Sequence, residues 1–174
     1  MIAAPSRGRT SGRDMIAATR MAIELTEKDF VPLEQCQFQH WGERSGAPFD
    51  RIRPLGDAAA ERVWARAAAL SSATWSEAAP GGDQIDLGSV DGDEKTVKRH
   101  VAAWLRRREA SDGPGPDQPV ILCYQPRVAV VVPWAIVCEH WLIFFWTPAC
   151  AWPTSEQWVL VHDGDRFAFG RRPR

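Results

Sequence analysis

The hydrophobic pattern changes period several times between Val120 and Gly170, which predicts strands and short helices within one compact segment. Residues 120–124 and 127–132 are short runs rich in β-branched and other apolar side chains. The Gln125-Pro126 step separates them, as expected for a turn. We therefore predict a β-hairpin at the start of this segment.

A second hairpin is predicted near the end of the same segment. Residues 157–161 and 166–169 again have strand character, and the connection between them contains an Asp-Gly step, which is a strong hairpin signal. Between the two hairpins the pattern is less regular. We predict a return to strand character over 142–146 and a proline-bounded loop over 148–153 that holds Cys150.

Three helices are predicted from apolar residues at helical spacing. Asp57 is a suitable N-cap for a helix over 58–70. Asp91 or Asp93 would cap a second helix over 94–110. Its apolar stripe is formed by Val97, Val101, Trp104 and Leu105. A short third helix follows Pro133, with an apolar face made by Trp134, Val137, Cys138 and Trp141.

The remaining segments are predicted to be irregular or extended. Residues 22–41 have extended character with a short turn, and 42–50 form a polar loop. Residues 52–55 are short and extended, because a residue before proline is pushed out of the α region. Residues 71–93 are rich in Ser, Gly and Asp, and we predict that they form the longest connection of the chain.

Together these elements predict an α+β fold. We expect a mostly antiparallel sheet, formed by the C-terminal half, to pack with two longer amphipathic helices and one short helix. The 174 residues, 45% hydrophobic and 25% charged, suit one globular domain, which we place at residues 21–170. Residues 171–174 would be a basic tail. Residues 1–20, with four arginines and one aspartate, have the composition of a disordered leader or of a start-site artefact.

We predict a cytoplasmic protein that does not enter a membrane. Residues 128–146 are almost wholly apolar and long enough to span a bilayer, but Pro133 and Glu139 interrupt them. A charge at the centre of a membrane span costs about 2.5–3.5 kcal/mol. Residues 1–20 lack the apolar stretch of a secretory signal. The four cysteines form no C-x-x-C pair, so we interpret them as reduced, mostly buried thiols.

Several short landmarks occur in a fixed order along the chain. They are Val31-Pro32-Leu33, Trp41, Arg51-Ile52-Arg53-Pro54-Leu55, Trp64, Cys123-Tyr124, Val131, Trp134, Ile136, His140-Trp141, Phe144 and Phe169-Gly170-Arg171. In this order they resemble an uncharacterised family of small bacterial proteins, known only as a domain of unknown function. The resemblance implies a cytosolic bacterial α+β protein with no assigned activity, and it transfers no catalytic residue.

The sequence predicts no metal site and no cofactor. Cys36 and His40 are four residues apart, and Cys138 lies near His140, but a structural zinc site needs four such ligands. The acidic stretch 83–94 lacks the ligand order of an EF-hand. Phosphate-binding glycine motifs are also missing from the sequence.

Nucleophilic catalysis by a cysteine is poorly supported. Cys123 and Cys138 lie in apolar runs, where burial would raise the pKa of a thiol. Cys150, in the proline-bounded loop, is the one thiol that we expect to be accessible. The sequence has no G-x-S-x-G motif either. We therefore favour a protein without enzymatic activity.

Two alternatives remain open. One is an enzyme whose pocket is assembled from residues far apart in the sequence, such as Glu139, His140 or His162. The other is nucleic-acid binding through the basic helix 94–108. The net charge of −1 and the position of Trp104 in an apolar stripe disfavour nucleic acid.

The nine tryptophans give the only positive indication of function. Four occupy stripe positions and should be core: Trp64, Trp104, Trp134 and Trp141. Four residues outside the stripes are candidate partner-binding residues: Trp146, Trp152, Trp158 and Arg171. Exposed Trp and Arg dominate the binding energy of protein interfaces. We therefore predict a non-enzymatic protein-binding domain, such as a bacterial immunity protein or inhibitor that neutralises a toxin.

Overall fold

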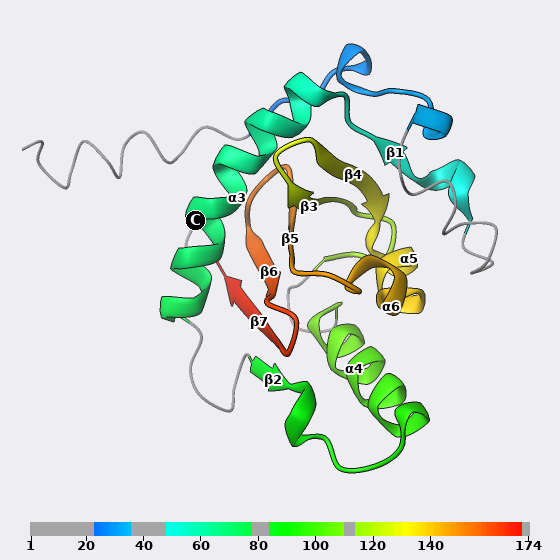
Figure 1. Ribbon diagram of the computed structural model, residues 1–174, viewed down its shortest axis with the longest axis vertical. Helices are drawn as coiled ribbons and strands as arrows, with labels where there is room; N and C mark the ends of the chain where they lie inside the picture. The colour runs from blue at the N-terminus through cyan, green and yellow to red at the C-terminus, as the bar shows by residue number, and fades with distance from the viewer. Residues whose placement is uncertain (1–22, 36–47, 78–83, 110–113, 172–174) are drawn as a thin grey trace, which may run out of the picture.

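The computed structural model describes residues 23–35, 48–77, 84–109 and 114–171 of the chain. Within them seven strands form one sheet in the order β1-β4-β3-β5-β6-β7-β2 (Figure 1). The strands are β1 (Arg53–Pro54), β2 (Gln84–Asp86), β3 (Pro119–Gln125), β4 (Val128–Pro133), β5 (Ala149–Pro153), β6 (Trp158–His162) and β7 (Arg166–Arg171). Every neighbouring pair is antiparallel. The predicted α+β class is confirmed.

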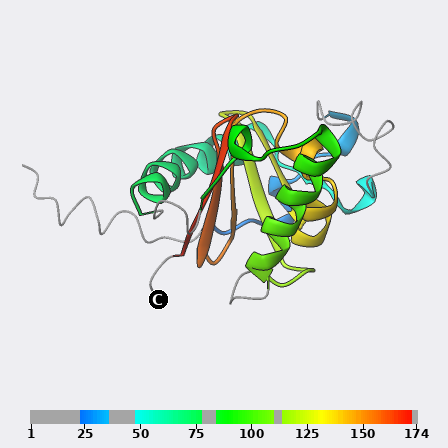
Figure 2. The ribbon, with the colours of Figure 1, turned by 90° about the horizontal axis from the view of Figure 1, so that it is seen from below.

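Helices cover both faces of the sheet. Figures 1 and 2 show α3 (Asp57–Glu77) on one face, and α4 (Glu94–Glu109), α5 (Trp134–Glu139) and α6 (Trp141–Phe144) on the other. Two buried clusters result, one on each face of the sheet. The cluster on the α4 side holds most of the aromatic rings, including Trp134 and Trp158 in an edge-to-face pair with centroids 5.1 Å apart.

Both predicted hairpins are present. Strands β3 and β4 pair along their whole length, with a register shift between Cys123 and Gln125. Strands β6 and β7 pair around a tight turn at Gly164, whose φ of 112° favours glycine. The predicted apolar stripe of the second helix is also buried, except for the half-buried Val97.

The structure corrects two predictions between the hairpins. Residues 142–146 are not a strand, because Trp141–Phe144 form helix α6 and turns follow it. Residues 148–153 are not a loop, because Ala149–Pro153 form β5, a central strand that is buried throughout. A strand covered on both faces shows no alternation of polar and apolar residues, so its sequence does not look like a strand. Pro153 is tolerated at the end of β5, opposite Val120.

The N-terminal half also differs from the prediction. Helix α3 begins at Asp57 itself and continues to Glu77, beyond the predicted end at residue 70. The segment predicted as a loop over 71–93 contributes the edge strand β2 and the short helix η4 (Leu87–Ser89). Before α3 the chain forms the one-turn helices η1 (Glu27–Asp29), η2 (Leu33–Gln35) and η3 (Phe49–Arg51). The predicted leader over 1–20, the Cys36–His40 pair and Trp41 lie outside the described residues.

Two further observations bear on the predicted boundaries and location. Arg171 belongs to β7, so the sheet reaches one residue into the predicted basic tail. In the part of the chain that the structure describes, helices long and apolar enough to cross a bilayer are absent.

Candidate functional site on helix α4

Helix α4 is buried along one stripe and exposes cationic side chains on its other sides. Val101, Trp104 and Leu105 pack into the core. The carboxylate of Asp93 accepts a hydrogen bond from the Thr96 amide at 2.8 Å and so caps the helix. The exposed and half-exposed cations are Lys95, Lys98, Arg99, Arg106, Arg107 and Arg108.

A groove of about 430 Å³ lies between α4 and the short helices α5 and α6. We call it the basic groove, and its charged and apolar walls are formed by Lys95, Lys98, Arg99, Arg106, Glu139, His140, Leu142 and Ile143. The Trp141 indole N–H donates to the Lys98 carbonyl at 3.3 Å and joins α6 to α4. Leu142 is 43% exposed, so the groove has an apolar contact point beside its charged side chains.

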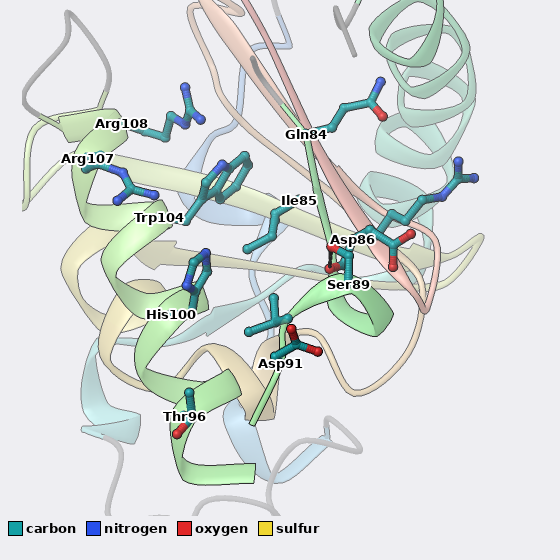
Figure 3. A pocket seen from close by; sticks show the side chains of 12 residues that line it. Gln84, Ile85, Asp86, Ser89, Asp91, Thr96, His100, Trp104, Arg107 and Arg108 are labelled. Atoms are coloured by element: carbon teal, nitrogen blue, oxygen red, sulfur yellow. Dashed lines mark hydrogen bonds between the residues drawn. The ribbon is translucent and has the colours of Figure 1, made fainter. Parts of the chain in front are cut away.

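A second hollow, of about 880 Å³, lies on the opposite flank of α4, beside β2 and η4 (Figure 3). We call it the α4 cleft. The α4 wall consists of Thr96, His100, Trp104, Arg107 and Arg108, and the opposite wall consists of Gln84, Ile85, Asp86, Ser89, Val90, Asp91 and Arg166. In Figure 3, Ile85 and Trp104 point toward each other across the middle of the cleft.

The guanidinium groups of the α4 cleft are held by neighbouring side chains. The Arg108 guanidinium carbon lies 4.4 Å from the ring centre of Trp104 and 5.6 Å from that of Phe169. Stacking of this kind orients an arginine, and the Nε atom of Arg108 is buried. Arg166 forms two hydrogen bonds with Asp163, at 2.7 and 3.1 Å. The cleft therefore presents positioned cations.

The opposite wall of the cleft carries both signs of charge, since Asp86 and Asp91 lie there together with Arg166. The Asp86 carboxylate accepts a hydrogen bond from the Gly88 amide at 2.9 Å, and the Ser89 hydroxyl donates to the Asp86 carbonyl at 2.8 Å. Figure 3 places Arg107 and Arg108 at one end of the cleft and Asp91, near Thr96, at the other. A ligand would thus meet positive charge at the C-terminal end of α4 and charges of both signs on the opposite wall.

Of the four predicted partner-binding residues, two are exposed in the structure and two are buried. Trp146 is 53% exposed and follows α6. Arg171 is also exposed, at the end of β7. Trp152 and Trp158 are buried in the two core clusters, and their prediction as contact residues is wrong. Trp64, predicted to be core, is instead 39% exposed on α3.

The residues proposed for an enzyme are not brought together. Glu139 and His140 line the basic groove, where His140 Nε2 lies 4.0 Å from a carboxylate oxygen of Glu139. His162 is buried beneath the rings of Phe145 and Phe167. Its Nδ1 lies 3.2 Å from the Thr147 carbonyl, and burial lowers the pKa of the ring. The histidine is therefore a neutral core residue.

The cysteines do not form an activated nucleophile. Cys150 is buried, so the prediction that it is accessible is wrong. Cys150 lies opposite Val161 in the β5–β6 register, and both side chains are on the α3 face of the sheet. The side chain of His162, the next residue of β6, points to the opposite face. Cys123 faces the same side as Cys150, and burial raises its pKa to about 12. Both thiols border an apolar pocket of about 170 Å³ under α3.

Comparison of the chain with known protein families, with curated proteins and with solved structures finds no match. The resemblance to an uncharacterised bacterial family stays a prediction. The described residues contain no group of three or more His, Cys, Asp or Glu side chains that could hold a metal ion.

Sequence reasoning missed the two hollows beside α4, although it identified the basic helix itself. The groove depends on α6, whose residues were predicted to be a strand. The cleft depends on β2 and η4, which were predicted to be irregular. The alternation of Gln84, Ile85 and Asp86 was the available signal for β2, but three residues are too few to establish a period.

Proposed function

We propose that this chain is a non-enzymatic binding domain that docks an acidic protein surface in the basic groove. The observation that supports the proposal most is the exposed Leu142, which lies among the cations of α4. Apolar side chains supply the energy of a protein interface, and surrounding charges select the partner and speed its association. An acidic partner with an apolar contact residue matches this surface.

A protein partner suits the groove better than a nucleic acid does. Glu139, 70% exposed, belongs to the wall of the groove, and Glu94 pairs with Lys98 at 2.5 Å. A phosphate backbone carries a negative charge at every nucleotide and would meet both carboxylates. A folded protein can place its acids opposite the cations alone and other groups opposite Glu139 and Glu94. Trp141, an aromatic ring of the groove, is buried and offers no surface on which a base could stack.

In its most specific form, the proposal is that the chain is an immunity protein or inhibitor and that its partner is a bacterial toxin. The small size of the chain and the absence of a catalytic motif from its sequence support this form. Trp146, which follows α6, is the predicted contact residue closest in sequence to the groove residue Leu142. This form of the proposal can be tested by co-expressing the chain with toxins encoded beside its gene and measuring the survival of the host cells.

The docking proposal can be tested without a known partner. A random peptide library displayed on phage would be panned against the full chain, and selected peptides would be synthesised and their affinities measured by fluorescence anisotropy. We expect acid-rich peptides. The triple variant Lys95→Glu, Arg99→Glu, Arg106→Glu should weaken their binding by about a hundred-fold, or roughly 3 kcal/mol.

A matched control carries the same change of net charge elsewhere. The triple variant Lys28→Glu, Arg51→Glu, Arg127→Glu reverses exposed cations outside both hollows and should leave binding within about two-fold. Equal loss in both variants would show that only net charge matters. That outcome, or the selection of peptides without acids, would contradict the proposal. Tighter binding of a single-stranded oligonucleotide, lost in the first variant, would favour the nucleic-acid alternative.

A further inference from the structure

Three exposed cations of the basic groove lie in one row along α4. We call Lys95, Arg99 and Arg106 the cation row, and Ala102 lies in line with them, between Arg99 and Arg106. At about 100° per residue, all four positions fall within roughly 60° of one another around the helix axis. Lys95 and Arg106 are separated by about 16 Å along that axis, at a rise of about 1.5 Å per residue. The cation row therefore runs nearly straight for about three turns of the helix.

The side chains of the cation row are available to a partner. Among the side chains that the structure describes, none forms a hydrogen bond or an ion pair with Lys95, Arg99 or Arg106. Arg99 interacts with Asp93 through charge alone. Hydrogen bonds from Thr96 are the main cause of the lowered pKa of Asp93, and the charge of Arg99 contributes less. Carboxylates of a partner can therefore pair with the cation row without breaking an ion pair.

Small and apolar side chains lie beside the cation row. Ala102 and its exposed neighbour Ala103 leave the middle of the row without a long side chain. The axes of packed helices are about 8–10 Å apart, and the side chains at the contact set this distance. On the other wall of the groove, Leu142 is exposed and Ile143 is half-buried. A partner helix can thus lie close to α4 and place an apolar side chain against Leu142.

The walls of the groove favour a helical occupant over an extended one. They are formed by α4, α5 and α6, whose backbone groups bond within the helices, as the His140 amide does to the Ile136 carbonyl at 3.0 Å. An extended segment relies on main-chain partners such as an edge strand offers, whereas a helix satisfies its own backbone. We propose that the partner docks an acidic amphipathic helix along the cation row. This inference rests on the proposed function, because it specifies the element with which the acidic partner binds the basic groove.

The spacing of the cation row predicts the sequence of the docking helix. Carboxylates opposite Lys95 and Arg106 would be about eleven residues apart in a helix that runs beside α4, since both helices rise about 1.5 Å per residue. An extended segment, at about 3.3 Å per residue, would cover the same distance in about five residues. We expect a third acid opposite Arg99 and a small or apolar residue opposite Ala102.

Charge exchange measures this spacing. The probes are acid-rich peptides of about 16 residues from the panning experiment, long enough to form a helix on binding. Lys95→Glu and Arg106→Glu should each weaken their binding about ten-fold. Each acid of a peptide is then changed to lysine in turn, and for each variant one such change should restore the affinity to within about three-fold. The two restoring positions should be about eleven residues apart. Lys28→Glu, outside the groove, is the control and should leave binding within about two-fold.

A change in the peptide alone gives a second measure and leaves the protein unaltered. Proline inside a helix removes a backbone hydrogen bond and clashes with the preceding turn. One residue between the two restoring positions, chosen because alanine is tolerated there, is replaced by proline. We expect the proline peptide to bind at least about ten-fold more weakly than the matched alanine peptide. The alanine peptide should also gain helical circular dichroism when it binds the chain.

The outcomes separate this inference from the proposed function. Restoring positions about five residues apart, or equal binding of the proline and alanine peptides, would overturn the docking helix and leave the basic groove as the docking site. The absence of any restoring change would overturn it as well. Peptide binding that survives the combined reversal of Lys95, Arg99 and Arg106 would instead contradict the proposed function itself.

Discussion

Arg66 on α3 and Glu156 in the β5–β6 turn form a partly buried ion pair that joins the helix to the sheet. The Arg66 Nε donates to Glu156 Oε1 at 2.6 Å, and Nη2 bonds the second carboxylate oxygen. The side chains are 13% and 12% exposed. Glu156 has a φ of 52°, a left-handed conformation that is uncommon for a residue other than glycine. The pair thus fixes both the turn and its distance from α3.

Breaking this pair should destabilise the fold. Arg66→Met leaves a partly buried carboxylate without its cation, so we expect a loss of about 2 kcal/mol in the free energy of unfolding, measured by urea denaturation. The double variant Arg66→Met/Glu156→Gln should lose less than the sum of the single variants, since no charge is left unpaired. Additive losses would show that the two residues act independently.

Two tryptophans that looked alike in the sequence should behave differently when truncated. Trp158 is 2% exposed and stacks on Phe169 with ring centroids 5.6 Å apart. Trp158→Ala should cost about 3–5 kcal/mol of stability. Trp146 is 53% exposed, so Trp146→Ala should change stability by less than about 1 kcal/mol. If thermal or urea unfolding showed similar losses of stability in the two variants, the burial assigned to these tryptophans would be refuted.

His162 should make the protein less stable in mild acid. Burial among Phe145 and Phe167 lowers its pKa below the usual value of 6.5, despite the nearby carboxylates of Asp163 and Asp165. The unfolded chain then takes up a proton near pH 6.5 that the folded chain does not. The contribution of neutral His162 to the free energy of unfolding is therefore fully present above pH 6.5. It decreases as the pH drops from there toward the lower pKa of the folded protein.

Urea denaturation at pH 8.0 and at pH 5.5 would measure this effect. His162→Phe should reduce the loss of stability between the two values, because the titrating group is gone. His100→Gln, at an exposed position on α4, is the control and should retain the loss. An unchanged pH dependence in His162→Phe would assign the effect to other groups.

The described thiols should be unreactive in the native protein. Cys123, Cys138 and Cys150 are all buried, and the pKa of Cys123 is raised to about 12. Thiol reagents attack the thiolate, so modification should require unfolding. In a Cys36→Ser variant, the rate of reaction with Ellman's reagent at pH 8 should match the rate of unfolding. Rapid reaction of one thiol would reveal an accessible site.

The sequence by itself determined the elements with strong local signals. Helix α4 follows from its apolar stripe and its aspartate cap, and the two hairpins follow from β-rich runs around short turns. These signals are local because helix caps and tight turns involve residues a few positions apart. The basic character of α4 was equally visible.

Only the tertiary structure decided which tryptophans are buried and where the hollows lie. Trp152 became core because β5 is enclosed between β3 and β6, a neighbourhood that its own residues do not encode. The Arg66–Glu156 pair spans 90 positions, and the α4 cleft forms because a three-residue strand pairs with β7 beside a helix. Such contacts depend on how distant segments pack, and burial is a property of the packed chain rather than of the residue type.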